Sequence, residues 1–229
     1  MVETINETSV SAKARSDVSS GRRRLLTAAA EEFSRHGYAG TSIAAIASRA
    51  GVSKSTIFHH FENKKALYLS VIEAAAGDFA STLDQVLVTK RKAEESLSDF
   101  QQAHLAHLHH NQQVAMLVLR ELQGDGPGET TGMVSEVLAG NYNRLVRYLA
   151  AARDKGEIRS DADLEVAALV MFAANAFVFQ TRQVLQEFPG LDLDRRPERF
   201  TCAVSDLIFR GLRQTRPEGE SPEGVNDEQ

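Results

Sequence analysis

Apolar residues recur at steps of three and four along most of the chain, and no stretch shows the strict alternation that is typical of a strand. This periodicity predicts an all-α protein of about nine helices. Three short helices are expected within residues 20–70. Longer helices are expected at about 63–88, 92–110, 112–123, 130–155, 160–188 and 196–214. Gly- and Pro-containing breaks at 124–128, 156 and 189–190 separate the later helices.

The segment between residues 40 and 67 has the pattern of a helix-turn-helix. Its first short helix carries an apolar stripe formed by Ile43, Ile46, Ala47 and Ala50. Gly51 follows where the chain must reverse, because glycine tolerates a positive φ. Ser53 is placed to cap a second helix, in which Ile57 points back to the first. Since the inward positions are apolar and the outward ones polar, the pattern favours this motif over a helical hairpin with a merely solvated face.

Charge is distributed unevenly along the chain. Residues 1–70 carry ten Lys and Arg against six Asp and Glu, whereas the rest of the chain carries sixteen against twenty-five. A local basic surface attracts phosphate even when the protein as a whole is acidic, with a net charge of −5. Charge and motif together therefore predict that the N-terminal part binds double-stranded DNA.

Residues 20–72 resemble the N-terminal domain of the TetR family of transcriptional regulators. The segment 22–38 is similar to the family's first helix, 41–47 to its second and 53–61 to its recognition helix. His60 and Phe61, followed by Lys64 and Leu67, are similar to the family's His-Phe-x-x-Lys-x-x-Leu signature. Phe58 stands where the family usually has Tyr, so a hydroxyl contact to phosphate is missing. The resemblance implies a larger helical domain that dimerises through its last two long helices and holds a small, rather apolar effector.

The recognition helix is expected to lie in the major groove with its N-terminal residues nearest the base edges. The candidates for reading bases are Lys54, Ser55, Thr56 and His59. Thr41, Ser42 and Lys64 lie at helix starts, where free N–H groups favour an anion, and are expected to contact phosphate. The other residues of the predicted DNA-binding surface are Arg22, Ser53, Phe58 and His60. Residues 22–24, all Arg, either touch the flanking DNA or form a solvated helix start.

The most apolar segment is 166–179, VAALVMFAANAFVF, in which Asn175 is the one polar residue. Fourteen residues are too few to span a membrane, which takes roughly twenty. A helix that is apolar on every side must be covered on every side. One face is therefore expected to pack in its own domain and another against a second copy, with a fully internal helix as the alternative. The predicted homodimer interface comprises Val170, Phe177, Phe200, Val204, Leu207 and Gly211.

Candidate effector contacts lie on the same apolar helix and on the helices before it. They are Phe172, Asn175 and Phe179, together with His104, Met116 and Arg120. Asn175 needs a hydrogen-bond partner, which can be the effector, its own core or the second subunit. His104, His107, His109 and His110 crowd one helix and could hold a metal or haem, but no Cys, Asp or Glu completes a ligand set locally. We expect no metal and no cofactor.

The domain organisation follows from these patterns. We expect a disordered polar arm at 1–19, the DNA-binding domain at 20–70, the helical effector-binding and dimerisation domain at 71–214, and a disordered acidic tail at 215–229. The first twenty residues lack the apolar run of a signal peptide, which predicts a cytoplasmic protein. Cys202 is the single cysteine and is expected to be a small core residue.

An enzyme is not expected, because the sequence contains none of the Gly-x-Ser-x-Gly, Cys-x-x-Cys, His-Glu-x-x-His or phosphate-loop motifs. The sequence predicts a DNA-binding transcriptional regulator, a dimeric repressor that a small apolar effector releases from a palindromic operator. The alternative is an activator or an architectural protein that senses no small molecule.

Overall fold

Nine helices and no strand make up the described part of the chain, which confirms the all-α prediction. The computed structural model describes residues 4–88, 90–123, 130–188, 190–191, 193 and 195–213. The predicted break at 124–128 and the predicted tail at 215–229 lie outside these residues. The helices are α1 (Thr4–Gly40), α2 (Ile43–Ala50), α3 (Lys54–His60), α4 (Lys64–Val86), α5 (Ala93–His110), α6 (Gln112–Leu122), α7 (Thr131–Asp154), α8 (Leu164–Leu185) and α9 (Pro197–Leu212).

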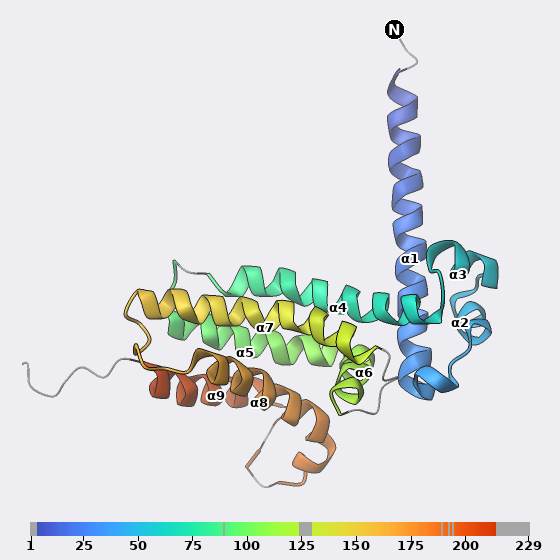
Figure 1. Ribbon diagram of the computed structural model, residues 1–229. Coiled ribbons are helices and arrows are strands. Elements are labelled where there is room, and N and C mark those ends of the chain that lie inside the picture. Colours follow the sequence, from blue (N-terminus) through green and yellow to red (C-terminus); the bar gives the residue numbers. More distant parts are fainter. Residues whose placement is uncertain are drawn as a thin grey trace, which may run out of the picture.

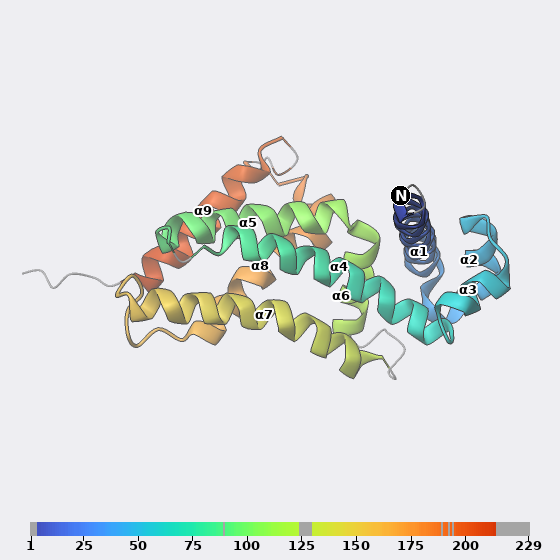
Figure 2. The ribbon, with the colours of Figure 1, turned by 90° about the horizontal axis from the view of Figure 1, so that it is seen from above.

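The helices form a small N-terminal unit and an elongated C-terminal bundle, which share α4 (Figure 1). α1, α2 and α3 lie at one end of the molecule, and α4 leads from them into the bundle. Within the bundle α4 packs against α5 and α7, while α8 and α9 pack against α5 (Figure 2). α6 contacts both α1 and the bundle, so it connects the two units.

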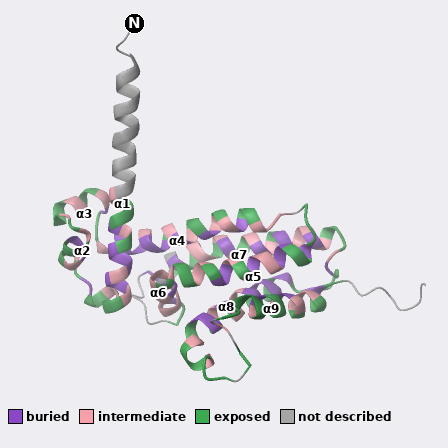
Figure 3. Ribbon diagram, turned by 180° about the vertical axis from the view of Figure 1, so that it is seen from behind, coloured by how far each residue is buried: buried purple, intermediate pink, exposed green. Residues whose placement is uncertain are grey.

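Each unit has its own apolar core, visible as the buried inner faces of the helices in Figure 3. Buried residues of the N-terminal core include Phe33, Ile46, Ile57 and Leu67. Buried residues of the bundle core include Phe79, Phe100, Leu149 and Met171. Leu117 of α6 and Val134 of α7 belong to the N-terminal core, although its other buried residues lie between Leu25 and Ile72 in the sequence. The DNA-binding part is therefore completed by helices from the C-terminal half of the chain.

The first helix differs from its prediction. α1 begins at Thr4, whereas the sequence predicted an arm without regular structure through residue 19. No Pro occurs between residues 4 and 40 and the first Gly is Gly21, so no residue interrupts the intrahelical hydrogen bonds before that point. Gly37 adopts φ 68° and breaks the regular helix close to its end.

The apolar helix α8 is longer than the fourteen apolar residues at its centre. Its 22 residues are long and apolar enough to cross a membrane by length and composition. One face is nevertheless packed against protein, since its buried residues are Leu164, Ala167, Ala168, Met171, Asn175, Val178 and Phe179. The other face exposes large side chains, which are Val166, Leu169, Val170, Phe177 and Val184. The alternative of a fully internal helix is therefore wrong.

Cys202 is exposed, so the prediction that it is a core residue is wrong. The buried side of α9 is formed by Thr201, Ser205 and Leu212. Cys202 follows Thr201 by one position, which rotates its side chain by about 100° away from that buried side. Its Sγ lies 3.7 Å from Nε2 of Gln102.

Candidate DNA-binding surface and effector cavity

Local capping builds the helix-turn-helix as the sequence predicted. Ser42 Oγ accepts a hydrogen bond from Ala45 N at 3.1 Å at the start of α2. Gly51 ends that helix with φ 67°, a conformation that other residues rarely adopt. Ser53 Oγ then accepts from Thr56 N at 3.1 Å and starts α3. The side chain of Ile57 is fully buried, which turns the opposite face of α3 outward.

The outward face of α3 carries the residues predicted to read bases. Lys54, Ser55 and His59 are exposed, and Thr56 is partly exposed. Ser53 Oγ lies 2.7 Å from Ser55 Oγ and 2.8 Å from Thr56 Oγ1, so three hydroxyls form one cluster at the helix start. Hydroxyls both donate and accept, and Lys donates to guanine, so this end of α3 can contact several base edges.

Phe58 and His60 complete the outward side of α3. The side chain of Phe58 is 52% exposed, although it is large and apolar. An apolar side chain at this position is suited to contact with the methyl group of thymine. His60 is partly buried, with its ring 5.3 Å from that of His59.

Two of the residues predicted to contact phosphate are hydrogen-bonded within the protein instead. Thr41 is 3% exposed, and its Oγ1 lies 2.7 Å from Gly37 O and 3.1 Å from Glu32 O. Lys64 Nζ donates to Tyr38 O at 2.7 Å and to Thr41 O at 2.9 Å, and lies 4.4 Å from the ring centroid of Tyr38. Both side chains thus hold the turn between α1 and α2. Lys64 fixes that turn to the start of α4.

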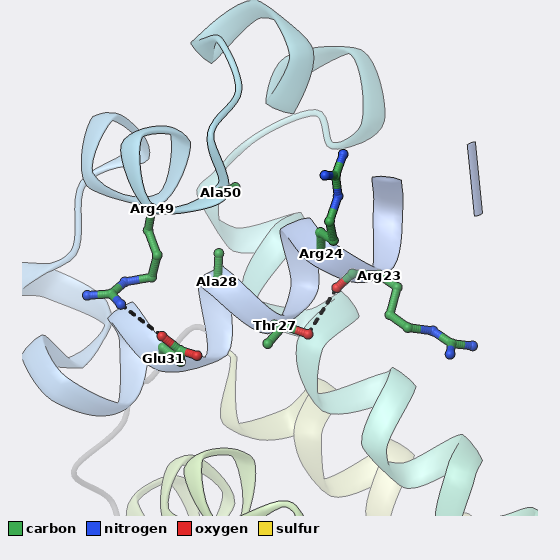
Figure 4. Close-up of a pocket in the computed structure, with 7 residues that line it drawn as sticks. All are labelled: Arg23, Arg24, Thr27, Ala28, Glu31, Arg49 and Ala50. Atoms are coloured by element: carbon green, nitrogen blue, oxygen red, sulfur yellow. Dashed lines mark hydrogen bonds and ion pairs between the residues drawn. The ribbon is translucent and has the colours of Figure 1, made fainter. Parts of the chain in front are cut away.

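A basic groove lies between α1 and α2 beside the helix-turn-helix (Figure 4). Figure 4 shows Arg23 and Arg24 extending from α1, while Arg49 reaches from α2 to α1. Arg49 Nη1 lies 2.8 Å from Glu31 Oε2, and its Nε is bound to Glu32. Arg49 therefore fixes α2 on α1, whereas Arg23 and Arg24 add exposed positive charge.

Arg22 takes a different position from its two neighbours. Its guanidinium carbon lies 5.4 Å from the ring centroid of Phe61, at the end of α3. The three consecutive Arg residues are therefore not one uniform solvated segment. Arg22 packs on the helix-turn-helix, and the other two line the basic groove.

A cavity of about 640 Å³ lies in the bundle, lined by α4, α5, α6, α7 and α8. Its volume is within the range of about 300–1,000 Å³ that is usual for small-molecule sites. No Lys, Arg, Asp or Glu is among its described lining residues. Its polar lining residues are His104, His107, Asn111, Ser135, Asn141, Tyr142 and Gln180. The cavity is therefore suited to an uncharged, mostly apolar molecule.

The cavity brings together part of the predicted effector site. His104 and Phe172 line it, whereas Met116, Arg120, Asn175 and Phe179 do not. Arg120 Nη1 is directed to Ser34 O of α1 at 3.4 Å, and Asn175 and Phe179 are completely buried in the core. Sequence reasoning missed the α4 wall, which consists of Ile72, Ala75, Ala76 and Phe79. Nothing in the sequence marks these residues, because their pattern is that of any core helix.

A buried polar cluster lies behind the cavity, between α5 and α8. Asn175 Nδ2 donates to Gln101 O at 3.0 Å and lies 3.1 Å from His104 Nδ1. Gln101 Nε2 donates to Met171 O at 3.1 Å. Asn175 thus bonds within its own subunit. Burial lowers the pKa of His104 to about 3, so its ring is neutral at physiological pH.

The four clustered histidines face different surroundings. His104 and His107 line the cavity, the ring of His109 lies 5.6 Å from that of Phe179, and His110 lines a groove between α1 and α4. Across the described residues, no three His, Cys, Asp or Glu side chains form a group that could hold a metal ion. The helical spacing suggested that several of these histidines bind one metal ion or haem, but the four rings do not come together.

α6 separates the cavity from α1. Val114, Val118 and Leu119 of α6 line the cavity, while Leu117 is buried in the N-terminal core. At the end of α6, Glu121 Oε1 accepts from Tyr68 Oη of α4 at 2.8 Å, with Glu121 only 1% exposed. Burial, followed by the bond to Glu121, raises the pKa of Tyr68. α6 therefore contacts the cavity on one side and α1 and α4 on the other.

The predicted dimer residues lie on α8 and α9 with different exposure. Val170, Phe177 and Leu207 are 46%, 60% and 72% exposed, and Gly211 is exposed. Phe200 and Val204 are partly buried. Phe177 also lines the cavity. Such large exposed apolar side chains on two adjacent helices are typical of a protein–protein contact.

Residues 25–71 match the family model described as bacterial regulatory proteins, tetR family. The chain is similar to the fatty acid metabolism regulator protein of Bacillus subtilis, with 27% identity over 65% of this chain and 76% of that protein. It is also similar to the HTH-type transcriptional repressor NicS of Pseudomonas putida, with 25% identity over 84% of this chain and 92% of that protein. Among solved structures, the transcriptional regulator FadR from Bacillus subtilis in complex with stearoyl-CoA has the same fold. The TM-score is 0.65 and the identity 22%, over 82% of this chain and 95% of that one.

Proposed function

We propose that this chain, which belongs to the TetR family and is a DNA-binding transcriptional regulator, is a homodimeric repressor released from its operator by a long-chain fatty-acyl compound. The observation that carries the proposal is the uncharged cavity, one wall of which is the helix that contacts α1. The chain acts in the cytoplasm, where operator DNA is found, and the neighbours named above are regulators rather than enzymes.

Two subunits are needed because one short recognition helix reads only a few base pairs. A dimer formed through the exposed faces of α8 and α9 carries two copies of α3. Two such helices about 34–36 Å apart enter successive major grooves, so the operator is expected to be a palindrome. Val170 and Leu207 are exposed apolar residues on the two helices of the proposed contact.

Release requires that ligand binding changes the position of α3. α6 supports this coupling, since Val118 lines the cavity and Leu117 is buried against α1. A ligand that fits the cavity better when α6 is displaced shifts the population towards a state whose two recognition helices no longer match the DNA. Couplings of this kind are typically worth about 1–3 kcal/mol, or roughly 5- to 150-fold in affinity.

The fatty-acyl class follows from the lining and from the relatives. A hydrocarbon chain needs apolar walls and no charged partner, which the cavity provides. The Bacillus subtilis relative regulates fatty acid metabolism, and the solved FadR structure holds stearoyl-CoA. No cationic side chain is among the described cavity residues, so the phosphates of a CoA group would remain outside.

The test uses an operator selected from a random DNA pool by the full-length protein. Fluorescence anisotropy then measures DNA affinity with and without palmitoyl-CoA, using free CoA as the control ligand. Palmitoyl-CoA is expected to weaken DNA binding by at least about fivefold. An Ala176→Trp variant, which fills the cavity from α8, should bind DNA but no longer respond. DNA affinity that stays constant with acyl-CoAs of every chain length would favour the activator or architectural alternative.

A further inference from the structure

The cavity has one deeply buried polar ring in its wall. His104 is 5% exposed, and its ring centroid lies 5.2 Å from that of Phe79, 5.7 Å from Phe100 and 4.8 Å from Phe172. Three aromatic rings therefore exclude water from most of the imidazole. A polar group in such surroundings is costly unless it is hydrogen-bonded.

The neighbouring amide determines which ring nitrogen carries the proton. The Asn175 atom 3.0 Å from Gln101 O must be the NH₂ group, because a carbonyl oxygen only accepts hydrogen bonds. The opposite amide orientation would place two acceptors against each other. The same NH₂ group lies 3.1 Å from His104 Nδ1, so Nδ1 is the acceptor and carries no hydrogen.

A neutral imidazole has one N–H, so the hydrogen of His104 is on Nε2. Nδ1 faces Asn175, and Nε2 lies on the far side of the ring, on a residue that lines the cavity. The hydrogen bond of His104 among the described residues is the one that Asn175 makes to Nδ1, and it leaves Nε2–H to bind a partner in the cavity. Asn175 thus holds His104 as a hydrogen-bond donor through Nε2, on a ring that lines the cavity.

We propose that His104 Nε2–H binds a carbonyl oxygen of the effector, so that the cavity selects uncharged carbonyl compounds such as acyl thioesters over free carboxylates. This inference rests on the proposed function of the cavity as the effector site. A carboxylate is rejected because no Lys or Arg lines the described cavity and neutral His104 gives one donor only. An aliphatic chain without a carbonyl fills the cavity but leaves Nε2–H unpaired.

The test compares two ligands that differ by one oxygen atom. Palmitoyl-CoA has the thioester carbonyl, and S-hexadecyl-CoA has the same chain on a thioether without it. Isothermal titration calorimetry, below the concentration at which either ligand forms micelles, gives both dissociation constants for the full-length protein. The wild-type protein is expected to bind palmitoyl-CoA about tenfold more tightly, the value of one net hydrogen bond.

Four variants identify the donor. In His104→Phe the tenfold preference should disappear while the thioether still binds, and in His104→Gln, which keeps an N–H donor, part of the preference should return. Leu108→Ala removes an apolar part of the same wall, so it should weaken both ligands and keep their ratio. His107→Phe is the matched histidine control, because His107 also lines the cavity.

Each outcome decides between the proposals. If His104→Phe still prefers palmitoyl-CoA over S-hexadecyl-CoA, or if only His107→Phe loses that preference, the assignment of His104 is wrong. The proposed function still stands in that case if palmitoyl-CoA releases the protein from DNA. If neither CoA ligand binds the wild-type protein, the fatty-acyl proposal itself fails. ¹⁵N spectra of the imidazoles provide an independent check, because Nδ1–H rather than Nε2–H on His104 would contradict the tautomer assignment.

Discussion

Lys64 provides a direct contrast between an expectation from sequence and one from structure. The resemblance to TetR regulators implies a phosphate contact, but Lys64 Nζ donates to Tyr38 O and Thr41 O at 2.7 and 2.9 Å. Lys64→Met removes the ammonium group while it keeps most of the apolar stem. We expect the variant to lose stability and to keep the salt dependence of DNA binding.

The magnitude follows from the contacts that are lost. A hydrogen bond from a charged donor contributes about 1.5–3 kcal/mol, and an ammonium group over an exposed aromatic ring about 0.5–1 kcal/mol. Lys64 is partly exposed, so water replaces part of these contacts. We therefore take the lower limit of each range, for one hydrogen bond and for the ring contact. The expected loss in the free energy of unfolding is about 2 kcal/mol. For a protein of this size that loss corresponds to a decrease in Tm of roughly 4–8 °C.

Two measurements separate the alternatives. Thermal unfolding followed by circular dichroism gives Tm, and anisotropy at several salt concentrations gives the slope of log affinity against log salt. Loss of a phosphate contact reduces that slope by about 0.9, whereas loss of a structural contact leaves it unchanged. Lys54→Met is the matched control, because Lys54 is exposed on α3 and should affect DNA binding but not Tm. An unchanged Tm together with a reduced slope for Lys64→Met would refute the structural role.

Three further predictions concern the other functional regions. Thr56→Ala and Lys54→Ala should each change the difference in binding free energy between operator variants by about 1–3 kcal/mol per contacted base. If both variants select the same sequences from random DNA as the wild-type protein, α3 is oriented differently. Leu207→Glu should raise the dimer dissociation constant at least about tenfold in analytical ultracentrifugation, since it places a charge in the proposed interface; a dimer of wild-type strength would argue against α9. Burial lowers the pKa of His104 to about 3, so below pH 6.5 the unfolded state binds a proton that the folded state does not. Stability should therefore decrease between pH 7 and 5, by about 2 kcal/mol from this residue; an equally steep decrease in His104→Phe would contradict this assignment.

The helix-turn-helix could be predicted because its determinants are local. Ser42, Gly51 and Ser53 act within three or four residues of themselves, and the burial of Ile46 and Ile57 follows from helical spacing. Helix-length periodicity likewise predicted the order of the later helices. These features need no knowledge of distant parts of the chain.

Contacts between distant residues could not be predicted in this way. Lys64 and Tyr38 are 26 positions apart, and Asn175 and His104 are 71 apart. The same separation explains why Met116 and Arg120 were assigned to the effector site although they do not line the cavity. Periodicity shows which residues share a face of one helix, but not which helix covers that face.

The sequence by itself determined the all-α class, the helix-turn-helix and the basic N-terminal region, since capping, turn geometry and charge are properties of short segments. Only the tertiary structure decided that Lys64 holds a turn and that the described residues of the cavity wall carry no charge. It also decided that Asn175 fixes the tautomer of His104. These properties arise where side chains from several helices meet, and the packing angles that bring them together depend on the whole core.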